Sequence, residues 1–233
     1  MTDVRGPKSN TRRKTEETIE AVAAAVPFAG GVLAVKYAQA FRRADQRRFE
    51  QWQQQMEASL DAIAAKVDGI DIEELFADDD FVDAVATATR IAEKSAAAEK
   101  RAALQNALFN LGLGSSIDAD KRAIYLRYVD ELTPSHLSLL RLADDPPGWF
   151  ERRSRAWPGG SLLGVVCAAF PTWGGDESFI DTIASDLAAR GLADLPLRTM
   201  MTPSGVMAQR TNPKGREFMR FISGPFDPTG DQQ

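Results

Sequence analysis

Catalytic and metal sites are commonly built from cysteine and histidine, and this chain of 233 residues has one of each, Cys167 and His136. A single cysteine excludes an internal disulfide and a cysteine-based zinc site. Any Ser-His-Asp or Cys-His arrangement would have to be built on His136. His136 is the third residue of a helix expected to begin at Pro134, a position where a polar side chain caps the helix or faces solvent. We therefore expect a structural histidine and no enzyme.

Nucleotide and metal motifs are also missing from the sequence. It contains no Gly-Lys-Ser/Thr phosphate loop, and Gly112-Leu113-Gly114 ends an expected helix instead of following a strand. The acidic stretch 68–83 lacks the spacing of a calcium loop, because Gly69 comes too early and Ile70 and Ile72 interrupt the acids. An acidic turn that favours the start of the next helix explains it. We expect no cofactor and no metal.

Long apolar runs are absent too, and the apolar run 21–35 has fifteen residues without a charge. A membrane span needs about 20, and Pro27, Gly30 and Gly31 interrupt the run where a spanning helix would continue. It is either a buried helical corner or a segment that docks reversibly into a membrane or partner. The candidate segment consists of Val26, Pro27, Phe28, Gly30, Gly31, Val32 and Leu33, with the flanking Arg42 and Arg43. Because about 18 polar residues precede the run, secretion is not expected; the setting is cytoplasmic, with membrane association if the segment docks on lipid.

Charge is distributed unevenly along the chain. Residues 1–48 carry ten basic and five acidic side chains, 49–144 carry nine and eighteen, and 145–233 carry nine and ten. The total of −5 argues against non-specific coating of nucleic acid. A basic end and an acidic middle can attract each other between copies, or can form two solvated faces.

Apolar spacing indicates a mainly α-helical protein. We expect helices over 15–26 and 31–67, and a further long helix over 81–111 that forms an antiparallel hairpin with 31–67. Its seam, Phe49, Trp52, Met56 and Leu60, is large for an alanine-rich partner helix, so a homo-oligomer is expected. Shorter helices are predicted from Asp118 or Asp120 to Leu132, and from Pro134 to Leu142.

The last third differs in character. It predicts helices over 161–170, 178–190 and 214–222, with a β-hairpin of strands 195–201 and 206–210 around Pro203-Ser204-Gly205. The domain boundaries follow from these elements: a disordered basic tail 1–14, a helical domain 15–145, a linker 146–160, a small α+β domain 161–223, and a flexible tail 224–233.

The stretch 187–222, with Gly191-Leu192 and Thr211-Asn212-Pro213-Lys214-Gly215-Arg216-Glu217-Phe218, resembles the closing half of a winged-helix domain. It has one residue more between Thr211 and Gly215 than that pattern. The resemblance implies a two-stranded wing followed by a helix. The whole layout also resembles uncharacterised bacterial helical proteins of the abortive-infection type, which implies a role in phage defence.

Two functions follow. The first is a non-enzymatic bacterial interaction or effector protein that engages a membrane or an unknown protein partner through its broken apolar segment and basic flanks. The alternative is a DNA-binding regulator that dimerises through its long helices. Nucleic-acid contacts would then come from Arg198, Arg210, Lys214, Arg216 and Arg220. Acidic residues on helix 178–190 would repel phosphates, so the winged-helix-like part suits protein docking better.

Overall fold

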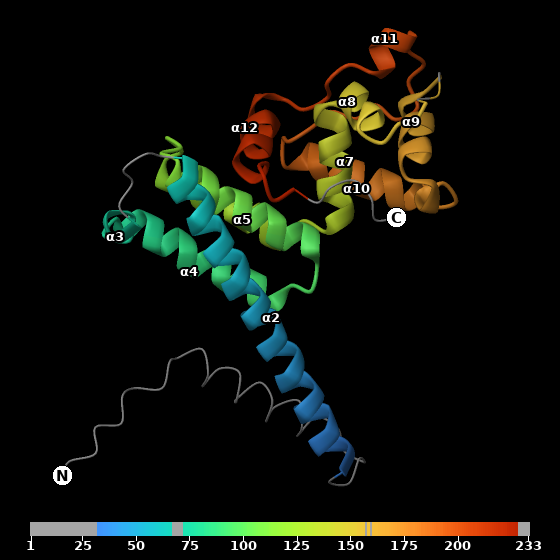
Figure 1. The fold of residues 1–233 in the computed structure, drawn as a ribbon. Helices are drawn as coiled ribbons and strands as arrows, with labels where there is room; N and C mark the ends of the chain where they lie inside the picture. The colour runs from blue at the N-terminus through green and yellow to red at the C-terminus, as the bar shows by residue number, and fades with distance from the viewer. Residues whose placement is uncertain (1–31, 67–71, 157, 159, 228–233) are drawn as a thin grey trace, which may run out of the picture. The chain divides into compact units, whose positions relative to one another are not determined.

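The computed structural model describes residues 32–66, 72–156, 158 and 160–227, and within these it is mainly helical (Figure 1). The chain divides into two compact units, Met1–Glu50 and Gln51–Gln233. The helices are α2 (Val32–Lys66), α3 (Ile72–Leu75), α4 (Asp79–Lys94), α5 (Ala98–Gly112), α6 (Ala119–Glu131), α7 (Pro134–Asp144), α8 (Pro146–Glu151), α9 (Leu162–Ala169), η1 (Pro171–Trp173), α10 (Glu177–Ala189), α11 (Pro203–Val206) and α12 (Pro213–Ile222).

The predicted helix over 31–67 is confirmed as α2, but the long helix expected over 81–111 is two helices, α4 and α5. Ser95 separates them, because its backbone is extended and its Oγ accepts a hydrogen bond from Ala97 N at 3.2 Å. A serine that bonds the backbone in this way competes with helix continuation. The antiparallel hairpin is therefore formed by α4 and α5, which pack side by side (Figure 1).

The part of α2 that belongs to the second unit packs on this hairpin. Trp52 is 1% exposed, and its indole Nε1 donates to Thr89 Oγ1 of α4 at 2.9 Å. Gln105 of α5 donates to the backbone oxygen of Gln55 at 2.8 Å, and Ile63 fills the space beside Gly112. Three helices thus enclose the first part of the core.

The short helices α6, α7 and α9 begin within one residue of the positions expected from the sequence. Asp118 caps α6, Thr133 caps α7 with Pro134 in its first turn, and Ser161 caps α9. Each cap side chain accepts a backbone N–H that the first helical turn leaves unpaired. Gly191, with a φ of +66°, follows α10 and its C-cap Arg190, as expected for a glycine stop.

The expected β-hairpin is wrong: the described residues contain no strand, and α11 lies where its turn was expected. Pro196 has no amide proton to donate in the first expected strand, and Arg210 N donates to Ala143 O of α7 at 2.8 Å. Within the described residues, two isolated bridges occur, Ser161 with Met200 and Ala193 with Thr211. Residues 195–210 contact α9 through Leu163 N and Leu197 O and α7 through Arg210 N and Ala143 O, and form no wing.

The segment expected to be a linker contains α8, whose Pro146, Trp149 and Phe150 are buried. Trp149 and Phe150 belong to the same cluster as buried residues of α5, α7 and α12. The expected tail is docked as far as Asp227: Phe226 contacts Phe109 edge-on, with ring centroids 5.8 Å apart. The described residues of the second unit thus share one continuous core that runs from Trp52 to Ile222.

Candidate functional site

Three features of the described residues bear on function: a basic stretch of α2, a polar cluster around His136, and an exposed acidic stretch beside α4. The apolar run 21–35 lies outside the described residues except for Val32–Val35, which belong to α2. The basic tail 1–14, the helix expected over 15–26, and Val26, Pro27, Phe28, Gly30 and Gly31 also lie outside them.

The basic stretch of α2 follows the apolar run. Arg42, Arg43 and Arg47 are exposed, and no carboxylate of the described residues lies within ion-pair distance of any of the three. Arg48 pairs with Asp45 at 2.8 Å. Phe49, at the end of the stretch, is 40% exposed. The stretch offers three unneutralised guanidinium groups on slightly more than one helical turn.

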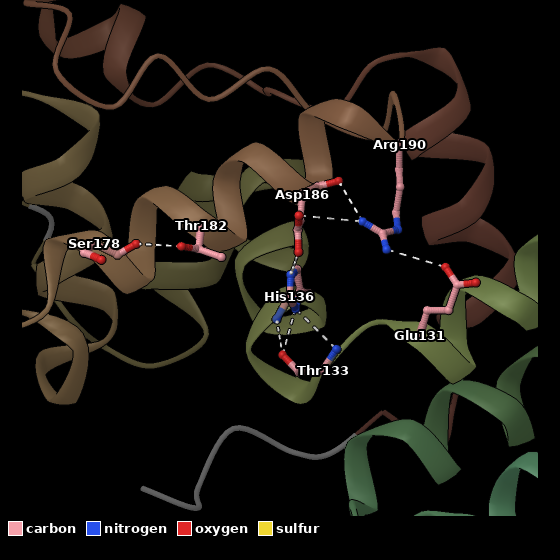
Figure 2. Close-up of polar contacts among 7 residues, drawn as sticks. All are labelled: Glu131, Thr133, His136, Ser178, Thr182, Asp186 and Arg190. Atoms are coloured by element: carbon pink, nitrogen blue, oxygen red, sulfur yellow. Dashed lines mark hydrogen bonds and ion pairs between the residues drawn. The ribbon is translucent and has the colours of Figure 1, made fainter.

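Figure 2 shows the cluster around His136, where the N-terminus of α7 meets α10. Nδ1 of His136 accepts a hydrogen bond from the backbone N of Thr133 at 3.3 Å and lies 2.7 Å from Thr133 Oγ1. Nε2 lies 3.2 Å from Asp186 Oδ2. Because Nδ1 accepts a backbone N–H, the imidazole proton is on Nε2 and is donated to Asp186. Arg190 connects the cluster to α6 through Glu131 at 3.5 Å.

This environment holds His136 neutral. Burial lowers the pKa of His136 below its usual value, although the hydrogen bond to Asp186 opposes that shift. The side chain completes a capping box with Thr133. Of the two expectations for His136, a cap or a solvent-facing side chain, the structure shows the cap, with the side chain 8% exposed and its contacts joining α7 to α10.

A cavity of about 400 Å³ lies beside α10, between that helix and residues 194–199. Arg198 is one of the residues that line it, with Nη1 at 2.7 Å from Asp181 and Nη2 at 3.1 Å from Glu177. The two carboxylates raise the pKa of Arg198, and the guanidinium lowers the pKa of Asp181. Two of the acidic residues that argued against phosphate binding are therefore partners of Arg198.

The other side chains considered for nucleic acid do not form one open patch. Lys214 Nζ donates to Tyr128 Oη at 2.6 Å and to the backbone oxygen of Arg190. Arg216 donates to Thr211 O at 2.9 Å, and the half-buried Arg210 donates to Met201 Sδ and to Gly205 O. Arg220 is exposed. Three of these five cations are engaged with uncharged atoms of the same chain.

Part of the seam considered for oligomerisation is buried against other helices of the same chain. Trp52 is buried against α4, while Met56 and Leu60 are half-buried. Of the four seam residues, Phe49 is the one with a substantially exposed side chain, at 40%. An intermolecular contact along the whole seam would require Trp52 to leave the core.

An acidic stretch with exposed apolar side chains follows α3. Phe76 and Val82 are 41% and 40% exposed, and Asp79 and Asp83 beside them are also exposed. Sequence reasoning treated these acids as a helix start, and Asp78 does cap α4 by accepting from Asp80 N at 2.9 Å. The sequence analysis did not identify Phe76 and Val82 as exposed apolar side chains near these acids. The helical spacing of α4 could have identified Val82, because it places this residue on the side opposite the buried residues.

No metal centre is formed by the described residues, since none of their His, Cys, Asp and Glu side chains gather in a group of three or more that could hold an ion. Among the same residues, no helix combines the length and the apolar character that crossing a membrane requires. In the comparisons with known proteins, no family model matches the chain, and no curated protein or solved structure shows significant similarity to it.

Proposed function

We propose that this chain is a non-enzymatic interaction protein that engages an anionic surface through residues 26–48. Such a surface is either a membrane rich in acidic lipid or an acidic face of a protein. The observation that carries the proposal is the exposed set Arg42, Arg43 and Arg47, none of which pairs with a carboxylate of the described residues. We further propose a role in bacterial phage defence, which the resemblance of the layout to abortive-infection proteins supports.

The energetics support attraction to a charged surface. Each arginine near an anionic membrane contributes about 1 kcal/mol at physiological ionic strength. Three of them contribute about 3 kcal/mol, which falls with salt because exposed charges are screened. Burial of the adjacent apolar residues in the interface would add to this attraction. Neither contribution is large, so reversible binding is expected.

Vesicle cosedimentation at two salt concentrations tests the membrane version. The full chain is mixed with vesicles of phosphatidylcholine alone, and with vesicles containing acidic phosphatidylserine. We expect pelleting with the acidic vesicles that decreases at high salt, and loss of pelleting for the triple variant Arg42→Glu, Arg43→Glu, Arg47→Glu.

A matched control reverses three exposed arginines elsewhere, Arg90, Arg127 and Arg220, and so makes the same change in net charge. This control should retain at least most of the pelleting. Equal loss in both variants would show that total charge matters and the α2 stretch does not. A wild-type chain that stays in the supernatant with both vesicles would remove the membrane version and leave an acidic protein face as the target.

A further inference from the structure

The exposed side of α4 carries Asp79, Val82 and Asp83, and the exposed Phe76 lies in the turn before this helix. We call Phe76, Asp79, Val82 and Asp83 the acidic face. Asp79, Val82, Asp83 and Ala86 are spaced as neighbours on one side of α4, and all four are exposed. The buried residues of the helix, Phe81, Ala84, Ala88, Ile91 and Ala92, occupy the opposite side. Phe76 packs edge-on against the buried Phe81, with ring centroids 5.6 Å apart, so the aromatic side chain is held in place at the surface.

The carboxylates of this face are not neutralised within the described part of the chain. Neither Asp79 nor Asp83 has a basic side chain within ion-pair distance there, whereas their neighbour Asp80 pairs with Arg122 at 2.8 Å. Exposed apolar side chains near carboxylates that lack a basic partner in the described residues fit a helix that presents arginines and an apolar side chain. The partner must be basic, and its apolar residue must lie within about two helical turns of its charges.

The basic stretch of α2 has these properties. Arg42, Arg43 and Arg47 are exposed without carboxylate partners in the described residues, and Phe49 is 40% exposed beside them. We propose that the acidic face of one copy of this chain binds residues 42–49 of a second copy. Opposite charges set the orientation, and Phe49 docks against Phe76 and Val82. The contact is between two different surfaces, so it forms a reciprocal dimer if it closes on itself and a longer assembly if it does not.

This inference rests on the proposed function to the extent that the same arginines serve both. An anionic surface and the acidic face then compete for residues 42–49. Without an anionic surface, the chain therefore associates with a second copy. When residues 42–49 bind an anionic surface, the second copy is released.

Charge reversal with rescue tests the contact, with molecular mass measured by size-exclusion chromatography and light scattering. The wild-type chain should associate at low salt and dissociate at high salt. Arg42→Glu with Arg43→Glu and Arg47→Glu, or Asp79→Lys with Asp83→Lys, should each weaken association at least tenfold. The chain carrying all five substitutions should associate again, and a mixture of the two single-sided variants should form a complex that neither forms alone.

Two controls keep the test decisive. Asp120→Lys with Glu151→Lys reverses two exposed acids elsewhere and should leave the mass unchanged. Circular dichroism verifies folding; if Asp79→Lys disturbs the start of α4, then Asp83→Lys alone replaces the pair. A wild-type chain that is monomeric at low salt, or an absence of rescue in the five-substitution chain, overturns the inference.

The two proposals fail separately. A monomeric chain whose arginines still carry it onto acidic vesicles would remove the self-association and leave the proposed function standing. An oligomer that shows rescue but ignores vesicles would remove the membrane version and support the contact between copies.

Discussion

Gly215, in the first turn of α12, lies directly against the backbone carbonyl of Leu192, and a Cβ at this position would overlap the carbonyl oxygen. The close approach allows Asn212 N to donate to Leu192 O at 3.2 Å, and it joins the start of α12 to the chain that leaves α10. A backbone atom cannot move aside as the end of a flexible side chain can. Glycine is therefore required here for space, independently of backbone dihedral angles.

Gly215→Ala should destabilise the protein by about 1–3 kcal/mol, as expected for overpacking in a packed region. Gly164→Ala is the matched control, because its nearest neighbour, Ser161 Oγ, is 3.8 Å from the added Cβ. In the helix interior of α9, alanine should instead stabilise by about 0.5–1 kcal/mol. Urea unfolding measures both changes. Equal effects of the two substitutions would contradict the close approach at Gly215.

Asn110 of α5 determines how α12 ends. Its Nδ2 donates to the carbonyl oxygens of Arg220, Phe221 and Ser223 at 2.9, 3.0 and 3.1 Å. These are among the carbonyls that a helix C-terminus leaves without partners. Asn110→Ala should cost about 1–2 kcal/mol in the free energy of unfolding.

Asn110→Asp gives a sharper test than alanine. A carboxylate has the same shape but accepts only, so it would face the three carbonyl oxygens without a donor. Unfolding by urea should therefore show a larger loss for aspartate than for alanine, and hydrogen exchange should increase first in the last turn of α12. An aspartate variant as stable as the wild-type chain would show that the amide donor is unimportant.

Local signals in the sequence predicted much of this fold, and contacts distant in sequence explain what they did not predict. The caps Asp118, Thr133 and Ser161 accept N–H groups of their own helix, so their positions could be read directly. The missing β-hairpin depends instead on Arg210 N donating to Ala143 O, 67 residues away in the chain. Apolar spacing predicts which face of a helix is buried, but it does not predict which other element of the chain packs against that face.

His136 and Arg198 show the same difference between local signals and contacts that are distant in sequence. The capping role of His136 followed from its position after Thr133-Pro134, but its bond to Asp186, 50 residues further along the chain, did not. Arg198 was considered for phosphate contacts because it is basic. In the structure it binds Asp181 and Glu177, one helical turn apart on α10. A charge alone does not reveal whether the fold neutralises it.

Arg198→Ala should leave the midpoint of thermal unfolding nearly unchanged, although Arg198 contacts two carboxylates. Its side chain is 56% exposed, and solvent screens exposed ion pairs. The substitution should nevertheless increase hydrogen exchange in residues 194–199, because these residues lose their contact with α10 through Arg198. A large decrease in the unfolding midpoint would mean that Arg198 holds this segment in place.

His136 should make stability depend on pH. The folded-state pKa of this side chain is lowered, mainly by burial, so the unfolded chain binds more protons between that pKa and about 6.5. The contribution of neutral His136 is fully present above about pH 6.5 and is lost as the pH falls toward the folded-state pKa. Protonation would also place an Nδ1 proton against the Thr133 N–H that Nδ1 now accepts, which opens the capping box. Urea midpoints should therefore decrease from pH 7 to pH 5.

His136→Gln separates this titration from those of the carboxylates. Glutamine at the third helical position preserves a capping box and cannot be protonated in this range. The variant should remain folded, and its urea midpoint should depend less on pH between 5 and 7 than that of the wild-type chain. Arg190, Glu131 and Asp186, which also face the cluster, are present in both proteins, so the difference between the two reports the substituted side chain. Equal pH dependence in the two proteins would place the titrating group elsewhere and would show that His136 keeps its protonation state through unfolding.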